Sequence, residues 1–429
     1  MKRYEKYKPS GEDWIGEIPN EWEVKRLASM LFDFSEKNNP DKQLLSITRE
    51  KGVILRDLDD DTVNHNFIPD DLSGYKLLKN GQFGMNKMKA WQGSYGVSAY
   101  DGIVSPAYYV FDIESTIYPE YFHKAIRSKF YVDQFGSASD GVRIGQWDLS
   151  KNRMKQIPFF IPPLSEQQAI AEFLDDKTAK IDQTISLKQK EINLLKERRQ
   201  ILIQKAVTKG LNDQVKMKDS RVDWIGEIPE HWEVRKLKQI CKLNENALDD
   251  RTDAKFEFDY VDIGSVTYED GIISNEKMLF KNAPSRARRI AKEGDTIVST
   301  VRTYLKAIDY INKSKSNFIY STGFAILQPN LDIYPKFLFA FVKSDAFTEQ
   351  VAINSKGMSY PAINSTDLGA QKVLYLPKEE QIQISERLEI IEEKIRKTIA
   401  IKEQEIEKLK EYKTVLIDNV VTGKVKVIA

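Results

Sequence analysis

Cysteine and histidine are scarce in this chain. Among 429 residues there are one cysteine, Cys241, and three histidines, His65, His123 and His231. A single cysteine forms neither an intramolecular disulfide nor a zinc site built on thiolates, and the three histidines are far apart in the sequence. The composition therefore predicts no disulfide and no transition-metal site. The acidic run at 57–61 predicts a solvated loop rather than a divalent-metal site.

Long apolar runs are also lacking. No window approaches the roughly 18 apolar residues that span a bilayer. Residues 1–13 are polar and contain no apolar stretch of the kind found in a signal peptide. These absences argue against membrane insertion and against secretion, so we expect a cytoplasmic protein.

Neither sign of charge is in excess. The chain has 65 basic and 64 acidic residues and a net charge of +1. Proteins that bind any polyanion usually carry a basic excess, so a nucleic-acid site in this chain has to be a local patch. With 41% hydrophobic and 30% charged residues the chain has a globular composition, and 429 residues predict two or more domains.

Recognisable catalytic motifs are missing as well. Thr422-Gly423-Lys424 lacks the glycine spacing of a phosphate-binding loop. There is no Gly-x-Ser-x-Gly elbow, and no Asn/Asp-Pro-Pro-aromatic motif of the kind shared by amino-methyltransferases. We therefore predict no catalytic residue, no ATP hydrolysis and no cofactor in this chain.

The strongest feature that is present is an internal repeat. The segment 13–19, Asp-Trp-Ile-Gly-Glu-Ile-Pro, recurs letter for letter at 223–229, and Trp-Glu-Val follows each copy after two further residues. A second set of identities, at an offset of 214, links 163–208 with 377–422. The chain is therefore a tandem duplication. Each copy has a Trp segment, a variable block of about 130 residues and a long charged segment.

The long charged segments have the heptad spacing of a coiled coil. No Pro or Gly occurs from Ser165 to Thr208, and steps of three and four separate the seam positions. We expect Ser165 to cap the first helix, and Gly210 and Gly423 to end the two helices. We expect the apolar seams of the two helices to pack against each other, with the helices antiparallel. Each helix would be about 65 Å long. The seam positions are Ile181, Ile185, Lys188, Ile192, Leu195, Arg199, Leu202 and Ala206, and then Ile395, Ile399, Lys402, Ile406, Leu409, Lys413, Leu416 and Val420.

The two variable blocks, 28–157 and 238–372, share a layout but little sequence. This pattern is typical of one scaffold that reads two different targets, and drift without selection for difference is the alternative. The blocks predict mixed α/β structure. The β-rich runs are 102–105, 108–111, 296–301 and 318–327, and Pro119 and Pro335 each open a short helix.

Two stretches of the variable blocks are locally basic. Seven basic residues face two acidic ones between Lys281 and Lys306, and four lysines meet no acid between Leu72 and Tyr100. Basic side chains hold phosphates, and Arg, Asn and Gln also make paired hydrogen bonds to purine edges. A patch of this kind, taken alone, is more often an ordinary solvated surface, so the DNA-binding interpretation depends on the architecture around it.

The repeated motifs closely resemble those of a known family. The sequence Asp-Trp-Ile-Gly-Glu-Ile-Pro-x-x-Trp-Glu-Val occurs twice, and Pro-Pro-Leu-Ser-Glu-Gln-Gln at 162–168 opens a long helix. Both resemble the DNA-specificity subunit, HsdS, of type I restriction-modification systems, and the resemblance covers essentially the whole chain. One departure is visible at 376–381, where Leu-Pro-Lys-Glu-Glu-Gln lacks the double proline.

The resemblance implies an α+β fold. Two mixed α/β target recognition domains are joined by two long antiparallel helices that form a coiled coil, with pseudo-twofold symmetry between the copies. The implied domains are an N-terminal Trp segment at 1–27, target recognition domain 1 at 28–157, a central helical region at 158–210, a linker and repeated Trp segment at 211–237, target recognition domain 2 at 238–372, and a distal helical region at 373–429.

The resemblance also implies a function in host defence. In this family each recognition domain reads one half of a bipartite double-stranded DNA site, and the helices set the gap between the halves. The subunit is not catalytic. It binds two methyltransferase subunits, which methylate adenine with S-adenosylmethionine, and two restriction subunits that use ATP and Mg. We therefore expect these cofactors in the partner subunits, and docking of the methyltransferases on 165–208, 379–421 and the Trp segments.

No individual DNA contact transfers from the family, because its base contacts vary. The candidate DNA-binding residues are chosen by local chemistry instead. They are Lys87, Lys89, Gln92, Arg143 and Gln146 in the first domain, and Arg286, Arg288, Arg289, Arg302, Tyr304, Lys306 and Tyr360 in the second.

Three alternatives remain. The chain could serve a methyltransferase-only system or a type IIB-like enzyme, a distinction that neighbouring genes would make. It could be a coiled-coil adaptor that joins proteins without touching DNA, although the two diverged blocks fit that interpretation poorly. A stand-alone nuclease or glycosidase is disfavoured, because no acid pair recurs at equivalent places in both blocks.

Overall fold

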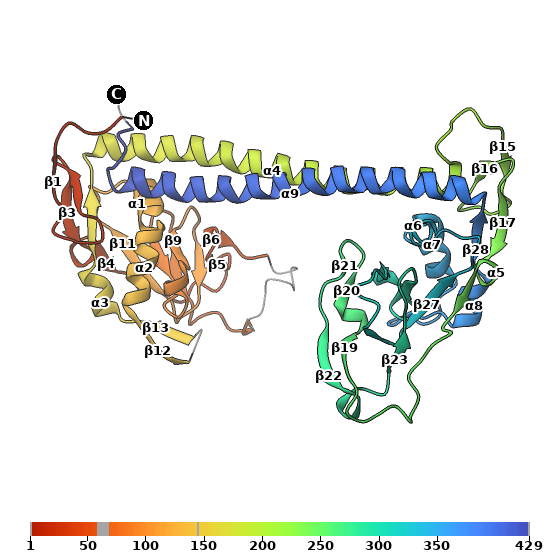
Figure 1. Cartoon of the computed structure of the whole chain (residues 1–429). Helices are drawn as coiled ribbons and strands as arrows, with labels where there is room; N and C mark the ends of the chain where they lie inside the picture. Colours follow the sequence, from red (N-terminus) through yellow and green to blue (C-terminus); the bar gives the residue numbers. More distant parts are fainter. Residues whose placement is uncertain (1, 58–67, 144–145, 428–429) are drawn as a thin grey trace. The chain divides into compact units, whose positions relative to one another are not determined.

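The computed structural model describes residues 2–57, 68–143 and 146–427, with the backbone alone at 142, 143 and 146. The chain divides into two compact units. Unit 1 comprises 1–188 and 403–429, and unit 2 comprises 189–402. Each unit therefore combines one Trp segment and one variable block with a part of both long helices (Figure 1). The domain boundaries expected from the sequence divide the chain more finely and stay predictions.

Unit 1 contains short strands, short helices and parts of two long helices. Its elements in chain order are β1 (Tyr7–Pro9), β2 (Glu17–Pro19), β3 (Glu23–Arg26), β4 (Leu31–Asp33), β5 (Leu45–Thr48), β6 (Gly52–Leu55), β7 (Lys76–Leu78), β8 (Phe83–Met85), η2 (Ala90–Gln92), β9 (Tyr95–Val97), β10 (Gly102–Val104), β11 (Tyr109–Ile113), α1 (Pro119–Ile126), α2 (Lys129–Ser137), β12 (Ser139–Arg143), β13 (Gln146–Leu149), α3 (Lys151–Gln156), β14 (Pro158–Ile161) and the start of α4 (Leu164–Lys209).

Unit 2 repeats this plan with a longer variable block. After the second part of α4 it contains β15 (Met217–Asp219), β16 (Glu227–Pro229), β17 (Glu233–Lys236), α5 (Leu237–Ile240), β18 (Cys241–Leu243), β19 (Glu257–Val261), β20 (Val266–Thr267), β21 (Gly271–Ile272), β22 (Glu276–Leu279), β23 (Ala287–Ile290), β24 (Thr296–Ser299), η5 (Thr303–Leu305), β25 (Ile308–Tyr310), β26 (Ile319–Ser321), β27 (Phe324–Pro329), α6 (Pro335–Val342), α7 (Asp345–Ile353), α8 (Ser365–Ala370), β28 (Lys372–Tyr375) and the start of α9 (Lys378–Val421).

The two units share the topology of one four-stranded sheet, and unit 2 has a second sheet of order β22-β19-β26-β23. Each has a four-stranded antiparallel sheet, of order β4-β11-β8-β9 in unit 1 and β18-β27-β24-β25 in unit 2. In each unit, a strand of the Trp segment pairs with the strand that directly precedes a long helix. These pairs are β3–β14 in unit 1 and β17–β28 in unit 2. The tandem duplication and the mixed α/β blocks are thus confirmed. The β-rich run at 318–327 is confirmed and forms two strands, β26 and β27.

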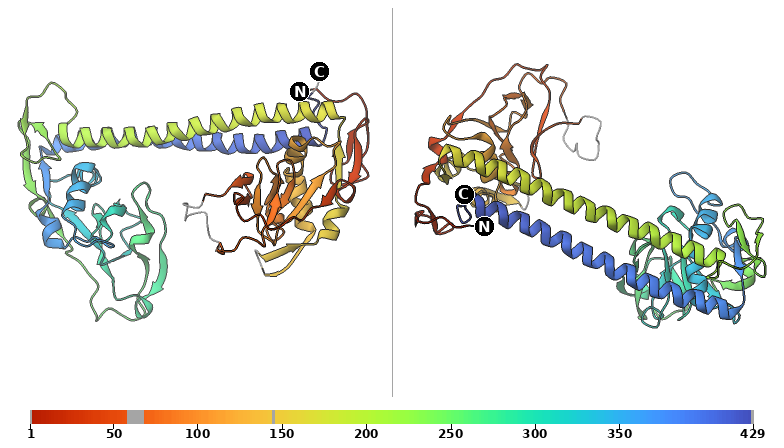
Figure 2. Two further views of the ribbon diagram at one scale, coloured as in Figure 1. Left: turned by 180° about the vertical axis from the view of Figure 1, so that it is seen from behind. Right: turned by 90° about the horizontal axis from the view of Figure 1, so that it is seen from above.

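The long helices are confirmed as an antiparallel pair within each unit. In unit 1, Asp182 pairs with Lys413 at 2.7 Å and Lys188 pairs with Glu405 at 2.6 Å. In unit 2, Glu191 pairs with Lys402. The partner's number falls as the α4 number rises, and Figure 2 shows the two helices side by side within each unit. The charged residues Lys188, Lys402 and Lys413, which interrupt the apolar seam predicted from the sequence, therefore form ion pairs across the two helices.

The helix ends follow the sequence closely, with one correction. Gly210 and Gly423 have left-handed φ values of +75° and +72° just beyond the two helices, as expected of a helix stop. Ser165 is not the N-cap. Helix α4 already begins at Leu164, because the carbonyl of Pro163 accepts the first backbone bonds, from the N–H groups of residues 166 and 167.

The repeated Trp segments are buried against the starts of the long helices. Trp22 and Trp232 are both fully buried. The Trp22 indole N–H donates to the buried carboxylate of Glu166 at 3.3 Å, and Trp232 donates to Glu380 at 3.0 Å. The identical letters of the two segments therefore serve one structural task, which is to fix a strand pair to a helix start.

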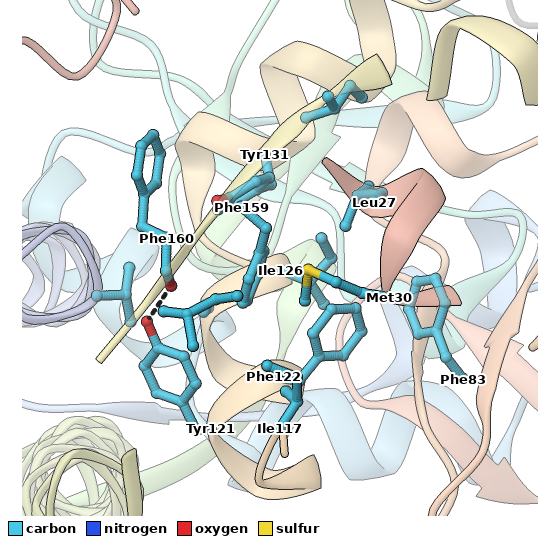
Figure 3. Close-up of a cluster of buried hydrophobic side chains, with 14 of the residues drawn as sticks. Leu27, Met30, Phe83, Ile117, Tyr121, Phe122, Ile126, Tyr131, Phe159 and Phe160 are labelled. Carbon is cyan, nitrogen blue, oxygen red and sulfur yellow. Dashed lines mark hydrogen bonds between the residues drawn. The ribbon is translucent and has the colours of Figure 1, made fainter. Parts of the chain in front are cut away.

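The core of unit 1 is rich in aromatic side chains. Phe122 and Phe159 pack with ring centroids 4.9 Å apart, and the Tyr121 hydroxyl donates to the carbonyl of Phe160 at 2.8 Å (Figure 3). Leu416 and Val420 of α9 join the same cluster. The corresponding cluster of unit 2 includes Ile203 of α4 and residues of α6, α7 and α9. The long helices thus form part of each unit's core.

The two ends of the described chain meet in unit 1. The backbone N–H of Lys426 donates to the carbonyl of Lys2 at 2.9 Å, and the Tyr7 hydroxyl donates to the carbonyl of Gly423 at 3.2 Å.

Candidate nucleic-acid interface

In unit 1, three predicted DNA-binding residues lie on one loop between β8 and β9. Lys89 is exposed, Gln92 is half-buried in η2, and Lys87 pairs with Asp148 at 3.0 Å, a bond that raises the pKa of Lys87 against the opposing effect of burial. Asn86 anchors the start of the loop. Its buried amide donates to the Tyr108 hydroxyl at 3.1 Å and its side-chain oxygen accepts from the N–H of residue 88.

The hairpin β12–β13 lies against this loop. Arg143 and Gln146 pair across the hairpin next to its tip, and their side chains lie outside the described part. Trp147 of β13 packs on Trp91 of η2 with ring centroids 5.0 Å apart. The fold therefore places the loop and the hairpin that carry the five predicted positions next to each other, although these positions are up to 59 residues apart.

The two tryptophans at this contact were not predicted as site residues. Four of the six tryptophans belong to the repeated segments, and Trp91 and Trp147 are the other two. The indole N–H of Trp91 is buried and has no hydrogen-bond partner in the described part of the chain. Their position outside the repeat was the signal in the sequence that could have identified them.

In unit 2, the loop between β24 and β25 carries Arg302, Tyr304 and Lys306. It surrounds the turn η5 and occupies the same place in the sheet as the loop of unit 1. Arg302 and Lys306 flank the turn with left-handed φ values of +50° and +47°. Residues with side chains rarely adopt this conformation, which costs roughly 1–2 kcal/mol and is concentrated at functional sites.

A second segment, 355–363, covers the base of this loop. Ala362 forms isolated bridges with Val301 and Lys356, and the hydroxyls of Thr303 and Ser355 are 2.9 Å apart. The Arg302 guanidinium lies over the Tyr360 ring, 5.0 Å from its centroid. The segment lies between α7 and α8, where unit 1 has its hairpin between α2 and α3. Tyr304 and Tyr360 are 56% and 65% exposed, so both aromatic rings are open to solvent.

The arginine just before β23 and the two arginines within this strand differ in their surroundings. Arg286 is exposed and 3.5 Å from Asp262. The Arg286 carbonyl accepts a hydrogen bond from the N–H of residue 322. The carbonyl of the adjacent residue 323 accepts one from the N–H of Thr300, at the start of the β24–β25 loop, so Arg286 adjoins this loop. Arg288 is already engaged, because it lies over the Phe280 ring and 3.5 Å from Asp250. Burial lowers the pKa of Arg289, and its Nε has no hydrogen-bond partner within the described ranges.

A match to a family model covers more than half of the chain. The model of the type I restriction modification DNA specificity domain matches residues 129–197 and 229–411. The chain belongs to this type I specificity family. Both matched ranges include parts of the long helices, and the second contains the complete β24–β25 loop.

Relatives of the type I specificity family match along the chain. A protein of Methanocaldococcus jannaschii, described as the MjaX specificity subunit of a type I restriction enzyme, is 25% identical over 96% of both chains. The EcoKI specificity subunit of Escherichia coli K12 is 24% identical over 68% of this chain and 61% of its own. These relatives are named specificity subunits, and none of these names is that of a catalytic subunit.

Solved structures of the same family confirm the fold. A chain from a study of complex assembly and conformational transition of the type I R-M system superposes with a TM-score of 0.71 at 15% identity, covering 95% of this chain and 99% of that one. The HsdS subunit of Thermoanaerobacter tengcongensis gives 0.55 at 16% identity, covering 95% and 98%. The expected class, with α/β domains joined by long helices, is therefore confirmed.

Other kinds of site find no support in the described residues. No group of three or more His, Cys, Asp or Glu side chains in this part of the chain is placed to hold a metal ion, and no helix in it is long and apolar enough to cross a membrane. Residues 58–61 of the acidic run and His65 lie outside the described residues.

Proposed function

We propose that this chain reads an asymmetric, bipartite DNA sequence with one loop face in each unit. The observation that carries the proposal is the equivalence of the two faces. The same loop of the same sheet presents Lys89 and Gln92 in unit 1, and Arg302 and Tyr304 in unit 2. The scaffolds match while the exposed side chains differ. We therefore infer that the two faces read different half-sites, because the exposed side chains at each face set its base preference.

The side chains of each face suit this task. Lys87 and Lys89 suit phosphate contacts, whereas Arg302 and Gln92 have the planar donor groups that bind purine edges in the major groove. Tyr304 and Tyr360 offer exposed ring faces for contact with sugars or thymine methyl groups. Arg143, Gln146, Arg286, Arg288, Arg289 and Lys306 complete the proposed DNA-binding set.

The long helices are the proposed spacer. Helices of 46 and 44 residues are about 65–70 Å long at 1.5 Å per residue. At about 3.4 Å per base pair this length limits the separation of the half-sites to below about two turns of B-DNA. These dimensions support the proposal of a short site with a fixed gap.

The same helices are the proposed docking surface for two methyltransferase subunits, followed by two restriction subunits in the full complex. Each unit leaves apolar side chains of the helices in solvent. Leu194 and Ile201, seven residues apart on α4 in unit 2, are 61% and 66% exposed, and Leu187 in unit 1 is 53% exposed. Exposed apolar residues at heptad spacing are typical of a helix that binds a further protein. In this proposal S-adenosylmethionine, ATP and Mg belong to the partner subunits, the chain itself is not catalytic, and the complex acts in the cytoplasm.

The decisive experiment is to co-express the chain with the methyltransferase encoded beside its gene, and to map methylated adenines across the host genome by single-molecule sequencing. A bipartite motif with one fixed gap supports the proposal and names both half-sites. A stable complex without sequence-specific methylation contradicts it and favours the adaptor alternative. The same motif without DNA cleavage when all neighbouring genes are present would identify a methyltransferase-only system.

A further inference from the structure

The hairpin β20–β21 is fixed to the strand that follows the proposed DNA-reading loop of unit 2. Its Gly271 has a left-handed φ of +68°, and a Cβ at this position would lie 2.5 Å from the Asp309 carboxylate of β25. That carboxylate accepts from the N–H of Ile272 at 3.0 Å. Glycine is therefore required here, and the tip of the hairpin, residues 268–270, has a defined position.

Tyr268 at the tip contacts the end of the loop. Its hydroxyl donates to the carbonyl of Lys343 at 3.0 Å, and burial raises the pKa of the phenol, which keeps the proton on the donor. The Lys306 ammonium lies over the same ring, 5.5 Å from the centroid. Lys306 also pairs with Asp345 at 3.2 Å. The strained end of the loop is therefore held against the hairpin tip.

Glu269, the next residue, forms an ion pair with Arg199 of α4. The Arg199 side chain is only 14% exposed, and its buried Nε has no hydrogen-bond partner among the residues that the structure describes. Arg199 is a predicted seam position of the coiled coil. A continuous set of contacts thus runs from the helix through the hairpin tip to the loop, all of it inside unit 2.

The duplication shows that this contact is specific to unit 2. The residue equivalent to Arg199 in α9 is Lys413, which pairs across the helices with Asp182. The position equivalent to Asp182 is Arg396, a like charge, and Arg396 pairs with Glu393 on its own helix. Arg199 therefore has no acidic partner at the equivalent position across the helices, and Glu269 takes that place.

Unit 1 holds its corresponding hairpin by other means. The β5–β6 hairpin contains the same turn, in which a threonine hydroxyl caps the N–H of Lys51 as it does that of Asp270. Arg127 donates to the carbonyls of Arg49 and Glu50 at 2.7 and 3.0 Å, and to that of Gly93 at the end of the unit 1 loop. All of these contacts lie within the first variable block, 28–157.

We propose that Arg199, Tyr268 and Glu269 are positioning residues for the half-site read by unit 2, with the hairpin acting as a strut between α4 and the Arg302–Lys306 loop. The inference rests on the proposed function. Because the strut fixes the direction of the loop rather than contacting a base, its loss lowers discrimination among bases at one half-site. It does not lower general DNA affinity.

The test uses the complete chain with its co-expressed methyltransferase, and the readout is the methylated motif. Arg199→Gln is compared with Lys413→Gln, which makes the same chemical change at the equivalent seam position. We expect Arg199→Gln to lower base discrimination at least tenfold in the half-site that Arg302→Ala also alters, and to leave the other half-site and the gap unchanged. We expect Lys413→Gln to leave the unit 2 half-site as in the wild type.

Two further variants separate positioning from folding. Glu269→Gln leaves the helices untouched and should reproduce the effect of Arg199→Gln, whereas the charge-reversed pair Arg199→Glu/Glu269→Arg should restore discrimination. Unchanged half-sites in both single variants, beside a clear wild-type motif, overturn the strut and leave the proposed function intact. Equal loss in both half-sites also overturns the strut. The absence of any wild-type motif overturns the proposed function itself.

Discussion

At the scale of single residues, backbone strain and side-chain exposure help to separate residues of the candidate face that stabilise the fold from those that we propose contact DNA. Arg302 combines a left-handed backbone with an exposed guanidinium over Tyr360. A turn alone would be better served by glycine, since glycine adopts this backbone without cost. We therefore interpret Arg302 as a residue whose side chain, rather than its backbone, matters at this turn.

Replacing Arg302 tests this interpretation. Arg302→Gly removes the side chain and relieves the backbone, while Arg302→Ala removes the side chain and keeps the strain. We expect the glycine variant to be more stable than the alanine variant by about 1 kcal/mol in chemical denaturation, and both to lose selectivity at one half-site only. Equal stability would contradict the strain, and uniform loss for all DNA sequences would make Arg302 a phosphate contact.

His123 makes the stability of unit 1 depend on pH. Burial lowers the pKa of His123 from 6.5 to about 4, and the N–H of Val97 donates to its Nδ1 at 3.1 Å. Between these values the unfolded chain binds a proton that the folded chain does not, so the free energy of unfolding falls as the pH falls from about 6.5 to 4. The loss is at most about 3 kcal/mol.

The non-titrating variant His123→Gln isolates this contribution. Glutamine can still accept from the Val97 N–H, so its stability at neutral pH serves as the reference. We expect the wild type to lose more stability than the variant between pH 7 and pH 4 in urea unfolding monitored by hydrogen exchange in unit 1. Parallel pH dependences of the two proteins would refute the assignment to His123.

At the scale of elements, one buried glutamine connects the start of each long helix to the variable block of the same unit. The Gln167 side-chain oxygen accepts from the N–H of Tyr118 at 2.7 Å, and its amide donates to the carbonyl of Pro162 at 2.9 Å. Gln381 makes the equivalent bonds to Tyr334 and Leu376, at 2.7 and 2.8 Å. The repeated Glu-Gln pair was recognised in the sequence, but this task was not.

Gln167→Leu should release the start of α1 from α4. The change leaves a buried N–H and a buried carbonyl unsatisfied, which costs about 2–4 kcal/mol in the free energy of unfolding. The neighbouring variant Gln168→Leu is the matched control, because that side chain is exposed. Hydrogen exchange at Tyr118 and in α1 is the measurement. Similar exchange in the two variants would show that the amide does not hold the two elements together.

At the scale of the whole molecule, the helices are the proposed ruler. Inserting one heptad into each helix, at 188/189 of α4 and 402/403 of α9, preserves the seam and adds about 10.5 Å of helix. We expect the gap of the methylated motif to lengthen by about three base pairs and both half-sites to stay the same. An insertion of four residues, which breaks the heptad, is the control and should lower activity. An unchanged gap after the heptad insertion would refute the ruler.

The sequence by itself determined the features that depend on neighbouring residues. Heptad spacing and the lack of Pro and Gly predicted both long helices to within a residue or two, and Gly210 and Gly423 predicted their ends. The repeat predicted that one plan occurs twice. Such signals are readable because periodicity and backbone preference act over a few residues.

Only the tertiary structure decided which distant residues share a face. The contact between Trp91 and Trp147, and the ion pair between Arg199 and Glu269, join residues 56 and 70 positions apart. Local composition carries no record of such pairs, because they depend on how strands and helices close on a common core. For the same reason the sequence placed Arg288 and Arg302 in one basic patch, whereas the fold engages Arg288 with Phe280 and leaves Arg302 open beside Tyr360.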